Sequence, residues 1–584
     1  MRAWTKCFLL ATLVAAIPGW AGAQQATQAT SAVDQVVDRI TAREQKEVAT
    51  IRQYSPLIET YIQDMKPDQE MGSIPVKDHY FIGLADFGKG VVDHSLLDAT
   101  PKGGLKGKLN PEGPLSHVSD FFNFGSSYDP TAFLDMVFVD ANGFDRSHYH
   151  FEYVRREFLG EVKCLVFDVT PLPHSGKGRF KGRIWANDQD YTIVRFNGVY
   201  TPIASYSGYN VHFDSWRINM QPGLWLPAYI YSQETSLKEV FGGNVRFRSQ
   251  TRLWGYNLRG AGHESDFTEL TVEAPGAIQD QAQASQDPTP VEAERTWQHE
   301  AEDNVLDRLQ RSGLIATPGS VDKILATVVN NIEVTNNIDI QPEIRCRVLL
   351  TSTLESFSIG HTIVLSRGLL DVLPDEASLA TMLAQEMGTI IVTKPEADQW
   401  GFNDLTNVST TEVLQRLSFR DTPHDAELAN QKAIELLKNS PYKDKLAVAG
   451  LFLKQLDAEQ KALPSLINPK LGNSVFFAQS LINAAPQLQP AKLDQIAALP
   501  LGARIKLDPW SDKVEMVTGK PVALFSEREK MPFEVTPFAP FLTYYTKAAV
   551  EAPPPAKADV AKTQPDVAQP VPAQPQDPQP QPQQ

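Results

Sequence analysis

The feature that most constrains the fold is a change in apolar rhythm about halfway along the chain. Between about residues 80 and 270, short segments alternate apolar and polar residues and are separated by turn residues, which predicts antiparallel strands. After residue 293 the apolar residues recur at helical spacing instead. Residues 274–294, rich in Ala, Gln, Asp and Pro, separate the two patterns as a linker. The sequence therefore predicts an α+β protein, with a β-rich domain over 80–273 and a mainly helical domain with a small sheet over 295–548.

The chain is long enough for this division, because 584 residues with 42% hydrophobic content can bury more than one core. In the first part, Arg183-Ile184-Trp185 and the strand at Tyr191 are joined through Asn187-Asp188, residues that favour a hairpin turn. The strand pattern over 178–198 and the later stretch 216–227 resemble the open, curved barrels of LolA- and RseB-type periplasmic carriers. That resemblance implies a groove for an acyl chain or a peptide, and a plainly packed core is the alternative.

Periodicity predicts the remaining elements. Residues 24–79 are expected to form a polar lead and two helices, the first carrying Val33, Val36, Val37 and Ile40 and the second Leu57, Ile58, Tyr61 and Ile62. In the second part, helices are expected at 293–312, 320–331, 375–391, 425–439 and 446–462. Strands are expected at 345–352 and 362–366, with a β-rich end piece at 503–507 and 522–525. The Pro- and Gln-rich residues 549–584 predict a disordered tail.

The first residues predict export. Arg2 and Lys6 precede an apolar run over 7–17, and Ala21-Gly22-Ala23 fits a small-residue cleavage site, so residues 1–23 are interpreted as a signal peptide. No later apolar stretch reaches the length of roughly 18 residues that a membrane-spanning helix needs. The expected location is therefore the periplasm or the outside of the cell.

The net charge excludes some classes of binding partner, and the cysteine positions bear on disulfide formation. The net charge is −16, and loss of the signal peptide would make it more negative, so neither nucleic acid nor anionic lipid is an expected partner. Cys164 and Cys346 fall in different predicted domains. They could pair in an oxidising compartment, although two buried single thiols are the commoner outcome.

The helix predicted at 375–391 carries the pattern most informative about function. Gln385-Glu386-Met387-Gly388-Thr389 has the spacing of HExxH, in which two His residues bind Zn²⁺ and the Glu acts as base. Gln385 and Thr389 take the two ligand positions, and neither an amide nor a hydroxyl is a usual zinc ligand. Without zinc, the pKa of a water stays near about 15.7 instead of falling to about 7. Glu386 is then a vestigial base on a scaffold that has lost its metal.

The residues around this helix resemble a known peptidase family. The stretch 355–370, ESFSIGHTIVLSRGLL, and the stretch 375–380, DEASLA, lead into Leu383-Ala384-Gln385-Glu386-Met387-Gly388-Thr389. In register from Glu355 to Thr389, the chain is similar to the HtpX and CAAX prenyl protease type of zinc metallopeptidase. The resemblance implies a gluzincin-like fold for the second domain, with proteolysis as the activity of its intact relatives.

The resemblance also implies where further functional residues would lie. The third ligand of the family is the Glu of an ExxxD pair on a later helix, and here Ala426 and Asn430 take those positions. A register shift of one residue would make Glu427 the ligand instead. Asn468-Pro469 stands where the family often has His-Pro. The family presents substrate backbone on an edge strand, which would comprise Thr362, Ile363 and Val364.

Structural roles are the alternative for Glu386 and for the histidines. Glu386 would point near the apolar stripe of its helix, where a carboxylate is costly, so it could pair with Arg367 or Arg420. His361 and His424 are interpreted as structural residues. His148 and His150 are expected to share one face of a strand, where their spacing suits either a metal or a solvated face. No third ligand lies near them in the sequence.

Three functions remain open at this point. The first is a zinc-less pseudopeptidase, without cofactor, that binds a polypeptide or envelope protein in quality control. The second is an active zinc metalloendopeptidase that uses unusual ligands. The third is a lipid or lipoprotein carrier that acts through the β-rich domain.

Overall fold

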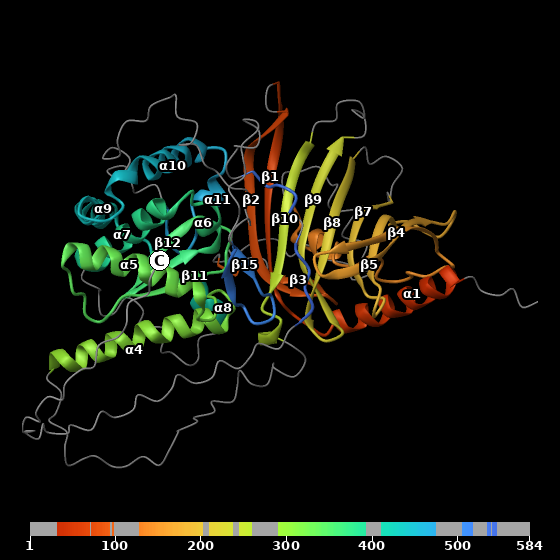
Figure 1. Cartoon of the computed structure of the whole chain (residues 1–584), viewed down its shortest axis with the longest axis horizontal. Coiled ribbons are helices and arrows are strands. Elements are labelled where there is room, and N and C mark those ends of the chain that lie inside the picture. Colours follow the sequence, from red (N-terminus) through yellow and green to blue (C-terminus); the bar gives the residue numbers. More distant parts are fainter. Residues whose placement is uncertain are drawn as a thin grey trace, which may run out of the picture. The chain divides into compact units, whose positions relative to one another are not determined.

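A computed structural model describes residues 32–69, 72–93, 96–97, 128–201, 209–236, 245–259, 290–392, 410–474, 505–517, 534–538 and 540–545. It is a mixed α+β structure dominated by one large antiparallel sheet (Figure 1). The predicted signal peptide, most of the linker, the strand at 522–525 and the tail at 549–584 lie outside the described residues. The last five positions of the predicted linker are helical, because α4 spans Pro290–Arg311. No helix in the described part of the chain is long and apolar enough to cross a membrane.

The large sheet has ten strands in the order β3-β2-β1-β10-β9-β8-β7-β6-β5-β4, so it is open, with β3 and β4 at its edges. Figure 1 shows the strand direction turning strongly from β1 to β4, as the right-handed twist of strands requires. The strands are β1 (Leu57–Asp68), β2 (Gly72–Asp86), β3 (Gly90–Asp93), β4 (Tyr149–Leu159), β5 (Val162–Pro171), β6 (Phe180–Asn187), β7 (Ile193–Tyr200), β8 (Tyr209–Gln221), β9 (Leu224–Ser236) and β10 (Val245–Trp254). The predicted hairpin is formed by β6 and β7, with Trp185 opposite Arg195.

The helix predicted around Leu57 and Ile62 is wrong, since these residues open strand β1. The first seven residues of β1 are buried, because both faces of the strand are covered. A strand buried on both faces reads as a continuous apolar run, which periodicity alone does not separate from a helix. The sheet therefore begins at Leu57 rather than near residue 80.

One face of the sheet, here called the inner face, is covered by α1 (Ala32–Ile51) and the short α3 (Pro130–Asp135). The prediction of α1 is confirmed, with Val37 and Ile40 buried and Val33 exposed. Helix α1 also brings Glu44 against Arg217 of β8 in a two-pronged ion pair with N···O distances of 2.6 and 2.7 Å, both side chains fully buried. This pair fixes the helix on the sheet.

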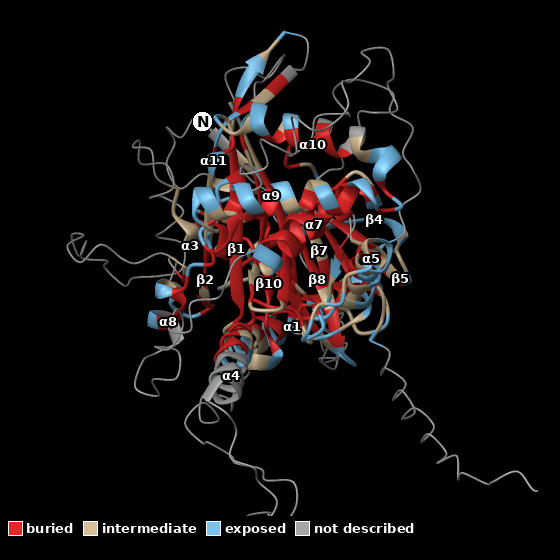
Figure 2. Ribbon diagram, turned by 90° about the vertical axis from the view of Figure 1, so that its left-hand side faces the viewer, coloured by how far each residue is buried: buried red, intermediate tan, exposed pale blue. Residues whose placement is uncertain are grey.

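The chain that follows the linker, here called the second part, contains most of the predicted helices. They are α4, α5 (Ser320–Asn336), α6 (Arg367–Val372), α7 (Glu376–Val392), α8 (Thr410–Arg416), α9 (Pro423–Lys438), α10 (Leu446–Glu459) and α11 (Pro464–Ile467). Helix α9 begins after Thr422, whose side chain caps the helix by accepting from the Asp425 amide. Pro423 suits the first helical position, because a backbone N–H at that position would have no partner within the helix. Figure 2 shows α7 buried and α9 with its exposed face outward.

The small sheet has the order β11-β13-β12-β14, with β11 (Arg345–Leu349), β12 (Glu355–Ile359), β13 (Thr362–Ser366) and β14 (Asn473–Ser474). Strand β13 pairs with β11 on one side and with β12 on the other, and all five of its residues are buried. The expectation that Thr362, Ile363 and Val364 form an edge strand is therefore wrong. Their backbone groups are already used inside the sheet.

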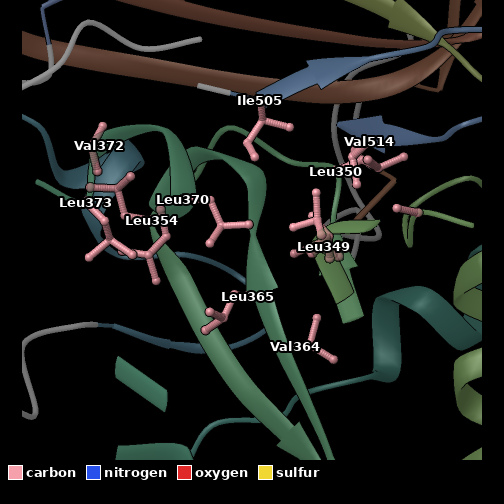
Figure 3. Close-up of a cluster of buried hydrophobic side chains, with 14 of the residues drawn as sticks. Leu349, Leu350, Leu354, Val364, Leu365, Leu370, Val372, Leu373, Ile505 and Val514 are labelled. Atoms are coloured by element: carbon pink, nitrogen blue, oxygen red, sulfur yellow. The ribbon is translucent and has the colours of Figure 1, made fainter. Parts of the chain in front are cut away.

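Apolar side chains hold the small sheet to its neighbours. Leu349, Val364, Leu365 and Leu370 pack with Ile505 and Val514 in one cluster (Figure 3). Ile505 and Val514 belong to the hairpin β15 (Ile505–Leu507) and β16 (Val514–Met516). The predicted β-rich end piece at 503–507 thus packs back on this part, and the Asp371 carboxylate fixes it by accepting from the Ile505 amide at 2.7 Å.

The other face of the large sheet, here called the outer face, meets the second part through buried polar contacts. Glu59 of β1 accepts from the amide and the hydroxyl of Ser352, each at 2.6 Å, and from Arg367 at 3.1 Å. Asp78 of β2 accepts from the amides of Ser465 and Leu466, each at 2.8 Å. The two parts share one apolar core, and the chain up to Tyr544 forms a single compact unit.

The two cysteines are free and buried, as the commoner outcome predicted. Burial raises the pKa of both thiols to about 12. They are therefore small apolar core residues that do not react as thiolates at neutral pH.

Candidate functional site

The site predicted from sequence lies on α7, in the interior of the second part. The helix begins at its predicted start, where the Asp375 carboxylate accepts from the Ser378 amide at 2.9 Å. Every residue from Ala377 to Thr389 is buried. Gln385, Glu386 and Thr389 therefore lie inside the protein, with exposed fractions of 4%, 0% and 5%. A substrate-binding cleft would leave at least one of these side chains open to solvent.

Glu386 accepts one strong hydrogen bond, from the hydroxyl of Ser356 in β12 at 2.6 Å. Its second carboxyl oxygen has no hydrogen-bond partner among the described residues. Burial, followed by the nearby Asp421 carboxylate, raises the pKa of Glu386 to about 8. The interior position of Glu386 therefore favours its protonated form.

The alternative that Glu386 pairs with an arginine is wrong. The Arg367 guanidinium donates to Glu59 and to the Ser352 hydroxyl, and Arg420 donates to the Pro469 carbonyl. No arginine therefore offsets the cost of burying a charged carboxylate, and this cost favours the protonated form of Glu386.

Asp421 is the second acidic residue of the site, and sequence reasoning missed it. Its carboxylate accepts from the Thr389 hydroxyl at 3.1 Å and from the Asn473 side-chain amide at 2.8 Å. The Asp421 amide in turn donates to Asn473 at 2.7 Å. The position that would hold the second His of HExxH is thus occupied by a hydroxyl that is bonded to an acid.

The position of the third ligand lies on α9, which packs closely against α7. A Cβ on Gly388 would come within 2.3 Å of the Ala429 carbonyl oxygen, so the glycine lets the two helices approach. Ala426 and Asn430 lie on the buried face of α9 together with Ala429. Glu427 is exposed and accepts from Gln431 at 3.1 Å, so the shifted register that would make it a ligand is wrong. The structure thus packs α7 against α9 and places no metal-binding side chain at these positions.

These residues do not fit a zinc ion. The donor set at the three positions is an amide, a hydroxyl that is already bonded to Asp421, and a methyl group. Within the described ranges, no group of three or more His, Cys, Asp and Glu side chains could hold a metal ion.

The histidines weighed from sequence lie elsewhere. His361 is in the turn between β12 and β13, and His424 is exposed near the start of α9. The His148 side chain faces Asp145, with 2.8 Å between Nδ1 and Oδ1. None of the three contacts Glu386 in a hydrogen bond of the described structure, so none replaces a missing ligand.

A cavity of about 310 Å³ lies between α1 and residues 140–145. Its lining includes Glu44, Arg52, Asp140 and Asp145, together with Val48. Charged groups of both signs suit a small polar molecule better than an acyl chain. The inner face itself is filled by aromatic side chains, among them Phe180, Phe196 and Phe213, whose ring centroids lie 5.8 to 6.1 Å apart.

No family model and no curated protein matches this chain. Among solved structures, it is similar to a LolA superfamily protein from Nitrosomonas europaea, with 13% identity, 37% of this chain and 90% of that chain covered, and a TM-score of 0.19. It is also similar to a putative outer membrane lipoprotein-sorting protein domain from Vibrio parahaemolyticus, with 12% identity, coverage of 37% and 89%, and a TM-score of 0.19. Likeness this slight does not identify a shared function. The peptidase resemblance continues to rest on the residues between Glu355 and Thr389.

Proposed function

We propose that this chain is an exported, catalytically inactive relative of the zinc peptidases that binds a polypeptide in the cell envelope. The observation that carries this proposal is the place of Glu386, which is fully buried and bonded only to Ser356 among the described residues. Burial also raises its pKa, which favours the protonated form. A general base must be ionised and must reach the water that it activates. Glu386 is out of reach of solvent, and its raised pKa disfavours the ionised form.

The surrounding contacts support a structural role for the old centre. Thr389, Asp421 and Asn473 bond to one another instead of facing a cleft. The helices that would have carried the ligands now pack Gly388 against Ala429. The second part therefore serves as a rigid body, firmly joined to the sheet, on which a binding surface can be built.

The test uses the purified full chain. Zinc is measured by mass spectrometry, and cleavage of an unfolded polypeptide is followed with and without a chelator, beside a peptidase with an intact HExxH as positive control. We expect no stoichiometric zinc and no chelator-sensitive cleavage, and Glu386→Gln should behave like the wild-type chain. One zinc per chain, together with chelator-sensitive cleavage that Glu386→Gln abolishes, would overturn the proposal.

A lipid carrier acting through the large sheet is the second candidate. The observation in its favour is the open sheet, whose inner face shares an apolar cluster with α1. The aromatic packing of the inner face opposes it, because an acyl chain needs a hollow interior. Solvent extraction of the purified chain followed by mass spectrometry decides the matter, since one bound lipid per chain would favour the carrier.

A further inference from the structure

The outer face of the large sheet carries a ladder of aromatic and cationic residues. Trp185 of β6 stands opposite Arg195 of β7, Arg195 opposite Trp216 of β8, Trp216 opposite Tyr229 of β9, and Tyr229 opposite Arg252 of β10. Residues that face each other across neighbouring strands lie on the same side of a sheet. The ladder thus crosses five strands at one level.

The ladder is rigid. The Arg195 guanidinium lies 4.3 Å from the ring centroids of both Trp185 and Trp216, so it is stacked between two indoles. Two hydrogen bonds to Asp214, at 2.8 and 2.7 Å, fix its orientation. Such a platform presents flat apolar surface at little cost in conformational entropy.

A segment of the chain's own C-terminal region crosses this face. We call residues 534–538 and 540–544 the strap. It has no regular secondary structure. Its first residues bind at β1 and β10, where Glu534 forms an ion pair with Arg248 and the Val535 amide donates to the Gln63 side chain at 2.7 Å. The strap enters the outer face beside the junction with the second part.

The rest of the strap continues across the sheet. The Phe538 ring meets Tyr229 of the ladder edge to face, with centroids 5.9 Å apart. The carbonyl of the buried Leu542 accepts from the Glu161 amide at 2.8 Å, in the turn between β4 and β5. The Tyr544 hydroxyl donates to Asn187 at 3.0 Å. The strap therefore spans from β1 to the far side of the sheet on a few spaced contacts.

The sheet is shaped for a backbone at this place. Gly160 has a φ of +65°, and a Cβ there would lie 2.4 Å from the Leu542 carbonyl oxygen and 2.7 Å from its nitrogen. Only glycine allows so close an approach. The strap is thus received as a bound peptide would be, with its backbone against a glycine and spaced side chains, those of Glu534, Phe538 and Tyr544, in contact with the sheet.

The strap leaves polar groups of this face unused. Trp216 and Tyr229 have exposed fractions of 1% and 6%, yet neither the indole N–H nor the phenol hydroxyl has a hydrogen-bond partner among the described residues. A buried donor without a partner is costly. In addition, Phe538 and Phe541 of the strap are 42% and 68% exposed. The strap is therefore an imperfect ligand for the surface that it covers.

We propose that the outer face from β10 to the β4–β5 turn is a binding groove for an extended polypeptide segment, and that the strap is a built-in ligand which another polypeptide displaces. This inference rests on the proposed binding function and names its site and regulation. The occupant is recognised by an acidic residue at Arg248, an aromatic residue at Tyr229 and a leucine at Gly160. The strap shows all three contacts.

A free peptide can displace the strap only if it outcompetes a segment of the same chain. The strap is tethered to the same chain, so it competes with an effective concentration in the millimolar range. A free peptide of the same sequence must overcome that competition. Weakening the strap while leaving the groove intact should therefore reveal peptide binding that the full chain conceals.

The experiment uses the full chain and a fluorescein-labelled peptide with the sequence of residues 532–546. Anisotropy gives its Kd for the wild-type chain and for a variant with Leu542→Asp and Tyr544→Ala, which weakens only the strap. We expect the variant to bind the peptide at least about tenfold more tightly than the wild-type chain. A peptide with the same two changes is the matched control and should not bind.

A charge exchange identifies the groove itself. Adding Arg248→Glu to the strap variant should weaken peptide binding by about tenfold, and a peptide with Glu534→Arg should restore it. A general loss of structure cannot produce such a rescue. Near-ultraviolet circular dichroism shows whether each variant keeps the packing of the ladder tryptophans.

Hydrogen exchange on the wild-type chain tests the proposal without any variant. The strap amides should exchange faster than those of β9 and β10, and faster still when the peptide is added, while the Glu161 amide stays protected by the new ligand. Strap amides as slow as those of β10, with no response to the peptide and no binding to a folded strap variant, would overturn the groove. That result would leave the zinc and cleavage test of the proposed function untouched, so the two failures are distinguishable.

Discussion

At the scale of single residues, Glu386 makes stability depend on pH. Its pKa is about 8 in the folded chain, against an ordinary value of 4.5. The folded pKa is the higher one, so the folded chain holds more protons between these values, and the free energy of unfolding falls as pH rises from about 4.5 to about 8. Glu386→Gln has no proton to lose in this window and should flatten the decline. Thermal melting at about pH 5 and about pH 8.5 measures the difference.

The control for this prediction is Glu427→Gln, because Glu427 is an exposed acid on the neighbouring helix α9. Its melting temperature should change with pH as that of the wild-type chain does. If Glu386→Gln also kept the wild-type pH dependence, Glu386 would be ionised in the folded chain and would meet the first requirement for a general base.

The residues around Glu386 show what a sequence can predict of a site. Helical spacing alone placed Glu386 near the apolar stripe of its helix, and the structure shows it fully buried. The partner was predicted wrongly, because the hydroxyl that bonds it, on Ser356, lies 30 residues away on a strand. Asp421 and Asn473 are separated by 52 residues and meet only through the tertiary fold. Single polar residues in a loop or a short strand give no periodic signal that predicts such a cluster.

At the scale of elements, the packing of α7 on α9 predicts that a zinc site can be rebuilt. Combining Gln385→His, Thr389→His and Ala426→Glu should give one zinc per chain, because two imidazoles four residues apart on α7 and a carboxylate on the facing side of α9 form a three-ligand set. Each single change should bind no zinc at micromolar concentration. Mass spectrometry of the folded variants measures the stoichiometry.

The matched control replaces Ala426→Glu by Ala426→Gln in the same triple variant, which keeps the size of the side chain and removes its charge. It should bind zinc at least about tenfold more weakly. A triple variant that folds without taking up zinc would show that Ala426 is not the third position.

The elements themselves were predictable where local pattern and tertiary role agree. Helices α1, α5 and α9 show their periodicity because one face of each helix contacts the core. Strand β1 was mistaken for a helix because the second part covers its outer face. The interior place of β13 was missed because strand order depends on which distant strand pairs with it, and a five-residue apolar run does not encode that.

At the scale of the whole molecule, the sheet and the second part are joined by buried groups that neither part satisfies alone. Arg367 is 1% exposed, and Glu59 is its anionic partner. Removing one member of a buried pair leaves an uncompensated charge, which costs about 3–5 kcal/mol. The chain up to Tyr544 should therefore unfold as one cooperative unit only while this contact is intact.

The last prediction follows from that dependence. Glu59→Ala should lower the free energy of unfolding by about 3–5 kcal/mol and should split the calorimetric transition into two, because the sheet and the second part then melt separately. The matched control is Asp168→Ala, which breaks the half-exposed pair with Arg183 on the same sheet. It should cost less than about 1 kcal/mol and leave a single transition. Combining Glu59→Leu with Arg367→Met removes both charges and should destabilise less than Glu59→Ala does. A single unshifted transition in Glu59→Ala would mean that the apolar core and the Asp78 contacts join the two parts without this ion pair.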